Sequence, residues 1–163
     1  MPQCTPDNAT PFHPSTGLTY LTSHFSVEEL SKTNTGIPNI PPDDVVRHEL
    51  TRTAQVLELC RAALGVALIV SSGYRCRAVN AAVGGVSTSA HVYGRAADFA
   101  PQNGWTLRDA FDRLRHDGSI PYDQIILEPA WVHIGIAPQG VTPRRQMLHA
   151  VPVRGRMTYE VVQ

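Results

Sequence analysis

Three absences narrow the function of this chain before any motif is considered. No stretch approaches the run of about 18 apolar residues that a membrane-spanning helix needs, so we expect no membrane insertion. Residues 1–17 are polar and proline-rich and lack the basic start and apolar stretch of a secretory signal, which predicts synthesis in a cytoplasm. The 14 basic and 14 acidic side chains leave no basic excess, so a nucleic-acid partner is not expected.

Cysteine is scarce, and the three residues are Cys4, Cys60 and Cys76. An odd number without a Cys-x-x-Cys pair argues against a disulfide framework and a thiolate zinc site, so we expect reduced thiols. A chain of 163 residues with 42% hydrophobic residues can bury a core without such crosslinks. We expect one monomeric domain over 1–163, with an N-terminal arm (1–24), a core (25–137) and a C-terminal extension (138–163).

Local patterns predict short helices and strands. Ser26 followed by Glu29 is typical of a capping box and predicts a short helix to about Lys32. Apolar residues at helical spacing predict the main core helix from Asp43 to Leu64, which Gly65 ends. Further elements are predicted as strands at 66–70, 95–100, 122–128 and 131–136, helices at 77–83 and from Thr106 to about Gly118, and an edge strand at 146–150. The close spacing of 122–128 and 131–136 predicts an antiparallel hairpin.

Two histidines and one aspartate form a candidate metal site. His91 and Asp98 are seven residues apart, and Gly94 between them allows a turn that other residues resist. A loop can therefore present the imidazole while the following strand presents the carboxylate, and His133 lies on a later strand. Two imidazoles and one carboxylate leave one position of a tetrahedral Zn²⁺ open for water, as in catalytic zinc sites. We predict that these three side chains bind one zinc ion.

Three further residues suggest hydrolysis. Glu128 lies five residues before His133, and a carboxylate near the metal can take a proton from water and pass it to a leaving amine. The guanidinium group of Arg75 can make two hydrogen bonds to a carboxylate or provide a positive charge for an oxyanion. Trp131 and His133 lie on the same face of their strand, and this face can line a cleft. Each residue alone is more commonly structural, so metal-assisted amide hydrolysis is predicted from the combination.

The segment 89–98 has the pattern Ser-x-His-x-x-Gly-x-Ala-x-Asp, and 131–133 reads Trp-Val-His. These motifs resemble the zinc D-Ala-D-Ala carboxypeptidase family, which also contains phage L-alanyl-D-glutamate endopeptidases. Three other segments also resemble this family: Phe-Ser-Val-Glu-Glu-Leu at 25–30, Ser-Gly-Tyr-Arg at 72–75 and Asn-Ala-Ala-Val-Gly-Gly at 80–85. The resemblance covers roughly residues 25–137.

The resemblance implies an α+β fold with a small central antiparallel sheet flanked by helices, shared with the lysostaphin-type peptidases and the hedgehog signalling domain. It implies the peptide stem of peptidoglycan as substrate, cut by a phage endolysin after release or by a related bacterial enzyme. Carried over by position, His91, Asp98 and His133 would bind zinc. Arg75 would stabilise the substrate carbonyl or carboxylate, and Ser89 would line the site.

The general base and the exact activity stay open at this point. Several relatives have an acid three residues before the last ligand, where this chain has Ala130, so Glu128 is the predicted base and Asp123 the reserve. Endopeptidase and D,D-carboxypeptidase action both suit Arg75, which could hold the α-carboxylate of D-Glu or a free C-terminal carboxylate. The alternatives are a non-catalytic zinc-binding structural or cell-wall-binding protein and a D-Ala-D-Ala dipeptidase, which would need a closed pocket.

Overall fold

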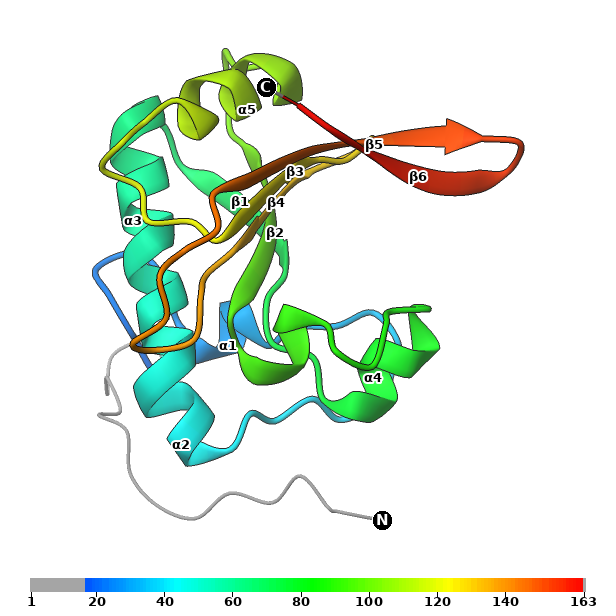
Figure 1. The fold of residues 1–163 in the computed structure, drawn as a ribbon. Helices are drawn as coiled ribbons and strands as arrows, with labels where there is room; N and C mark the ends of the chain where they lie inside the picture. The colour runs from blue at the N-terminus through cyan, green and yellow to red at the C-terminus, as the bar shows by residue number, and fades with distance from the viewer. Residues whose placement is uncertain (1–16, 163) are drawn as a thin grey trace.

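A six-stranded sheet forms the centre of the molecule (Figure 1). The computed structural model describes residues 17–162, so Cys4 and most of the predicted N-terminal arm lie outside the described residues. The strands are β1 (Leu68–Ser72), β2 (Ala96–Pro101), β3 (Gln124–Leu127), β4 (Val132–Gly135), β5 (Gln146–Val153) and β6 (Arg156–Val161), in the order β1-β2-β4-β3-β5-β6. Neighbouring strands pair antiparallel except β3 and β5, which are parallel. The predicted α+β class is confirmed.

The main core lies between the sheet and two of its helices, α3 and α5, which pack on one face (Figure 1). The helical segments are α1 (Val27–Leu30), α2 (Asp43–Val45), η1 (Val46–Leu50), α3 (Thr51–Leu64), α4 (Arg77–Ala82), η2 (Ala90–Tyr93) and α5 (Leu107–Arg115). Phe111, Leu57 and Phe99 are fully buried in this core, and each such side chain stabilises the fold by about 1.5–3 kcal/mol. Within residues 17–162, no helix combines the length and apolar character that crossing a bilayer requires.

The predicted helix boundaries are largely confirmed. Ser26 Oγ accepts the Glu29 N–H at 3.1 Å, although α1 ends at Leu30, two residues before the expected Lys32. The long helix begins at Asp43 and includes the π-helical segment η1. It ends with Gly65 as its C-cap, whose φ of 68° is the left-handed conformation that glycine adopts easily. Cys60 and Cys76 are free thiols, as expected.

The predicted strand at 146–150 is confirmed, but its predicted place at the edge of the sheet is wrong. The strand there, β5, is longer and lies inside the sheet, between β3 and β6. A two-residue turn at Arg154 and Gly155, both with positive φ (49° and 78°), lets β6 fold back as the true edge strand. Such a turn matches the twist of an antiparallel hairpin. The C-terminal residues therefore extend the central sheet.

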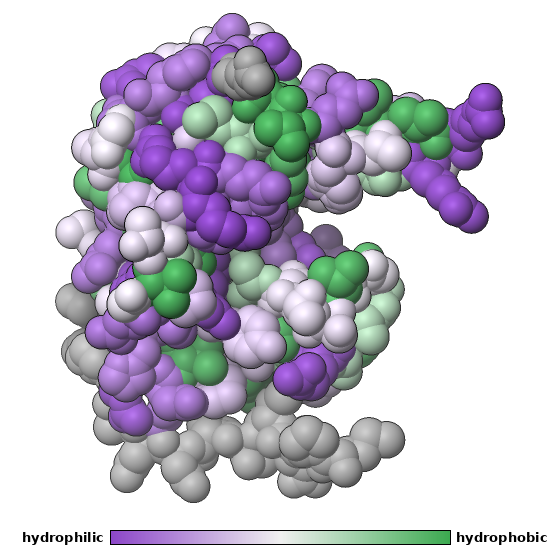
Figure 2. All heavy atoms as spheres, viewed as in Figure 1, coloured by the Kyte–Doolittle hydropathy of each residue, from purple (hydrophilic) through white to green (hydrophobic). Residues whose placement is uncertain are grey.

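The β5–β6 hairpin projects from the body of the molecule, and the segment that carries α4 projects on the same side (Figure 1). Figure 2 shows a hollow between these two projections. Met157, Tyr159 and Val161 alternate along β6 and are exposed, by 42%, 52% and 73%. One side of the hollow is thus bordered by a strand that leaves apolar and aromatic side chains uncovered.

Candidate metal centre

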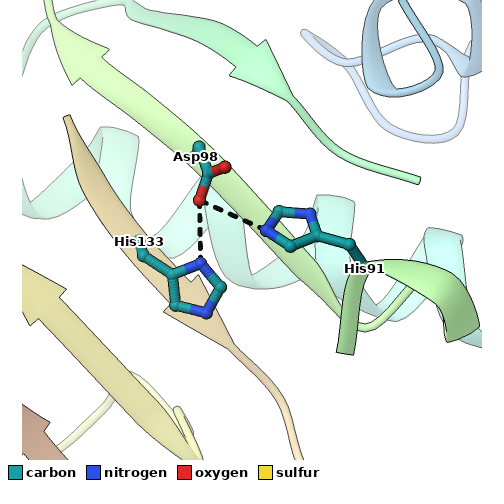
Figure 3. Close-up of side chains that lie close together, drawn as sticks. All are labelled: His91, Asp98 and His133. Atoms are coloured by element: carbon teal, nitrogen blue, oxygen red, sulfur yellow. Dashed lines mark hydrogen bonds and ion pairs between the residues drawn. The ribbon is translucent and has the colours of Figure 1, made fainter. Parts of the chain in front are cut away.

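The three predicted ligands converge (Figure 3). His91 comes from η2, Asp98 from β2 and His133 from β4. Asp98 Oδ1 lies 2.8 Å from His133 Nδ1 and 3.3 Å from His91 Nε2, and one ligand atom of each residue lies within 4.8 Å of the others. Zinc bonds of about 2.0–2.2 Å to nitrogen and oxygen fit between donor atoms at such separations. The side chains can therefore share one ion.

Strand register explains why Asp98 and His133 meet. The two residues are direct cross-strand partners on β2 and β4, so their side chains point to the same face of the sheet. Phe99, the next residue on β2, points into the main core instead. His91 reaches the same face because Gly94 (φ 70°) ends η2 and turns the chain into β2, as the sequence predicted.

A backbone carbonyl orients His91. Its Nδ1 lies 2.6 Å from the Gly73 carbonyl oxygen and donates to it, which leaves the Nε2 lone pair facing Asp98. Burial lowers the pKa of His91, although Asp98 acts in the opposite direction, so the imidazole is neutral at pH 7. A neutral imidazole is the form that binds a metal. The sequence did not identify this partner, which is 18 residues earlier in the chain.

The second carboxylate oxygen of Asp98 is held by Arg75. Arg75 Nη2 lies 2.5 Å from Asp98 Oδ2, and Arg75 Nε donates to Ser72 Oγ at 2.8 Å. Burial opposes the charge of Asp98, but His91 and the hydrogen bond from His133 outweigh it and hold its pKa well below the ordinary value. Asp98 is therefore a carboxylate with one oxygen on the arginine and the other between the histidines.

A cavity of about 360 Å³ adjoins Asp98, one of the three candidate ligands. Arg75, Lys32 and Trp131 line it together with Asp98, so two cations and an indole face the same space. Ser89 is not among the described residues that line this cavity. It directly precedes η2, and its carbonyl oxygen accepts the Val92 N–H at 3.0 Å. The substrate-binding roles of Arg75, Trp131 and Ser89 stay predictions.

Glu128 lies at the turn of the β3–β4 hairpin, on the sheet face of the candidate ligand His133. Its N–H donates to the Trp131 carbonyl at 3.0 Å, and strand alternation puts its side chain on the same face as His133. Burial raises the pKa of Glu128, while a hydrogen bond with Tyr159 and the neighbouring His133 act against this rise. Tyr159, on β6, is a neighbour of Glu128 that sequence reasoning missed, because only the register of β5 and β6 brings the two residues into one row.

A family comparison decides the class of protein. Residues 23–135, most of the chain, match the family model described as peptidase M15. The protein belongs to the peptidase M15 family. The resemblance to the zinc D-Ala-D-Ala carboxypeptidases is thereby confirmed, and the family implies a zinc peptidase. No curated protein matches the chain.

The donor set of this M15 peptidase fits zinc. Two imidazoles and one carboxylate are the donors that catalytic zinc sites use, and three protein ligands leave a position open. His91 and Asp98 are each only 3% exposed, and both have a second partner, the Gly73 carbonyl and Arg75, that fixes their orientation. Such secondary contacts are typical of metal ligands.

Asp123, the reserve base, lies at the opposite end of β3 from Glu128. Its carboxylate receives three hydrogen bonds from the Arg144 guanidinium, at 2.6, 3.0 and 3.2 Å, and these contacts lower its pKa. A carboxylate engaged in this way is a poor proton acceptor, and it stands apart from the ligands. Ala130, the position of the acid in several relatives, is exposed in the turn between β3 and β4. Of these two carboxylates, only Glu128 lies on the sheet face of His133.

Proposed function

We propose that this M15 peptidase is a zinc-dependent peptidoglycan hydrolase that cleaves an amide bond in the stem peptide. The observation that carries the proposal is the group His91, Asp98 and His133, with Glu128 on the same face of the sheet as His133. Metal ligands with one open position and a nearby carboxylate base are the requirements of metal-assisted amide hydrolysis. A binding protein would need neither the base nor the open position.

Glu128 is the proposed general base. When bound, zinc supplies a Lewis acid that polarises the scissile carbonyl and lowers the pKa of water to about 7. Glu128 takes a proton from the attacking water and passes it to the leaving amine. Burial raises the pKa of Glu128. Its carboxylate is therefore a stronger base than that of an exposed glutamate and takes up a proton more readily in each cycle.

The charges in the cavity suit an acidic peptide. Lys32 and Arg75 both line it, and these two cations can attract the carboxylates that stem peptides carry. Trp131 adds an apolar surface for the alanine methyl groups. The hollow between the β5–β6 hairpin and the segment of α4 is open along one side (Figure 2). We propose that the substrate lies in this hollow, where an open side favours a stem peptide within a larger wall fragment over a free dipeptide.

We propose a single-chain enzyme that acts on the cell wall after release, as a phage lysin does. The test is incubation of the zinc-loaded protein with defined muropeptides, followed by mass spectrometry of the products. New amine termini that disappear when zinc is chelated are expected. The product masses assign the bond: loss of one D-Ala indicates carboxypeptidase action, and separation of L-Ala from D-Glu indicates endopeptidase action.

Two results would contradict the proposal. Absence of new termini after long incubation, with zinc bound, would favour a non-catalytic zinc-binding protein. Cleavage of free D-Ala-D-Ala with no cleavage of muropeptides would favour a dipeptidase.

A further inference from the structure

The C-terminal hairpin brings a tyrosine to the site from outside the segment that matches the family. The family model ends at residue 135, whereas Tyr159 lies on β6. Tyr159 pairs with Ala150 of β5, and Leu127 of β3 pairs with His149, so Ala150 is the next residue in register with Glu128. Glu128, Ala150 and Tyr159 therefore form one row across the same face of three neighbouring strands.

The small side chain of Ala150 makes the contact across this row possible. Neighbouring strands are about 4.8 Å apart, so Tyr159 and Glu128 are separated by the whole width of β5. Ala150 has only a methyl group there, so the phenol of Tyr159 can extend over it toward the Glu128 carboxylate. Each of the two groups shifts the pKa of the other, which agrees with their closeness. A larger residue at 150 would stand in the path of Tyr159.

Packing beneath the row holds the hairpin against the sheet. Ile126, Leu148 and Ala150 form a separate buried cluster on the site face, with exposures of 7%, 7% and 3%. This cluster joins β3 directly to β5, the strand that carries β6. Tyr159 is thus fixed relative to Glu128 through packed strands, although its ring is half exposed.

We propose that Tyr159 is a positioning residue, whose hydroxyl donates to Glu128 and holds this carboxylate toward His91, Asp98 and His133. Glu128 follows the last residue of β3 and precedes the exposed turn at Pro129 and Ala130, so its backbone fixes the side chain only in part. A long, flexible side chain has several rotamers, and a base contributes fully only in the orientation that reaches the water. The inference rests on the proposed function, in which Glu128 is the base.

Tyr159→Phe tests the proposal because it removes the hydroxyl and keeps the ring. We expect kcat on a muropeptide to fall by about fivefold, the factor that corresponds to one hydrogen bond. KM and the zinc content should stay unchanged, since Tyr159 touches neither the cavity nor the ligands. In a Glu128→Gln background the same substitution should cause no further loss, because the two residues act as one unit.

Thr158→Val is the matched control. It removes a hydroxyl from the same strand, but Thr158 points to the opposite face, where it donates to the Val151 carbonyl at 2.8 Å. Wild-type kcat is expected for this variant. A Tyr159→Phe enzyme with wild-type kcat, or one that loses the same factor with and without Glu128, would overturn the proposal while leaving the peptidase function intact.

A second measurement does not depend on turnover. With ¹³C-labelled tyrosine, the Tyr159 ring signal can be assigned by its loss in Tyr159→Phe and titrated in zinc-free protein. The neighbouring Glu128 raises the pKa of Tyr159, in addition to the effect of burial, so Glu128→Gln should move this titration to lower pH. An identical titration in both proteins would show that the contact is absent in solution and refute the inference, whatever the protein hydrolyses.

Discussion

Replacing Asp98 by Asn would measure how strongly the buried charges of the site stabilise the metal-free fold. Oδ1 lies between His133 and His91, Oδ2 faces Arg75 at 2.5 Å, and the side chain is 5% exposed. The amide keeps the shape but removes the charge, which leaves Arg75, at 17% exposure, without its anionic partner. Removal of one partner from a buried pair costs about 3–5 kcal/mol. We expect a loss of about 3 kcal/mol in the free energy of unfolding, since Arg75 keeps some contact with water.

The pH dependence of this loss follows from the lowered pKa of Asp98. A carboxyl group with a depressed folded-state pKa contributes stability that is fully present above its unfolded-state pKa, about 3.9, and is lost as the pH falls toward the folded-state value. The difference between wild type and Asp98→Asn should therefore be largest at neutral pH and smaller by about 1 kcal/mol at about pH 3. Urea unfolding of zinc-free protein, followed by circular dichroism, measures both values.

Asp123→Asn is the control for this experiment. It removes the same charge from a pair whose arginine, Arg144, is 64% exposed, so we expect a loss of about 1 kcal/mol or less. Equal losses for the two variants would refute the view that burial makes the Asp98 network strong. A difference that stays constant in acid would refute the assigned pKa direction.

Three further outcomes are expected. Glu128→Gln should lower kcat by about 100- to 10,000-fold with zinc still bound, whereas Asp123→Asn should keep wild-type activity; substantial activity in Glu128→Gln would exclude it as the base. Chelation should abolish hydrolysis, and free zinc at about 100 times its Kd should raise the free energy of unfolding by about 2.7 kcal/mol, measured by thermal melting. Gly73→Ala should destabilise the fold by about 1–3 kcal/mol and weaken zinc binding, because a Cβ there overlaps the Leu30 carbonyl. Gly118→Ala meets open space and should do neither.

The local elements were predictable because their signals lie within a few residues of one another. Thr106 Oγ1 accepts the Asp109 N–H at 3.1 Å and begins α5, as the sequence pattern indicated. The hairpin of β3 and β4 follows from two apolar segments separated by a short turn. Caps and tight turns depend on side chains and backbone groups close in sequence, so tertiary context changes them little.

The convergence of the three candidate metal ligands was predictable for a related reason. His91 and Asp98 belong to one continuous loop-and-strand unit, in which Gly94 sets the turn. Strand alternation then requires Asp98 to point away from the core that takes Phe99. The pairing of Asp98 with His133 completes the group.

The sequence by itself predicted the candidate ligands, most helix boundaries and Glu128, because each depends on spacing along one or two short segments. Only the tertiary structure decided which groups support them: the Gly73 carbonyl behind His91, Arg75 on Asp98, and Tyr159 on Glu128. Tyr159 is in register with Glu128 because β5 joins β3 in parallel inside the sheet, and not at its edge. Strand order and register depend on the packing of the whole chain, and a change of one residue in register would turn Tyr159 to the opposite face.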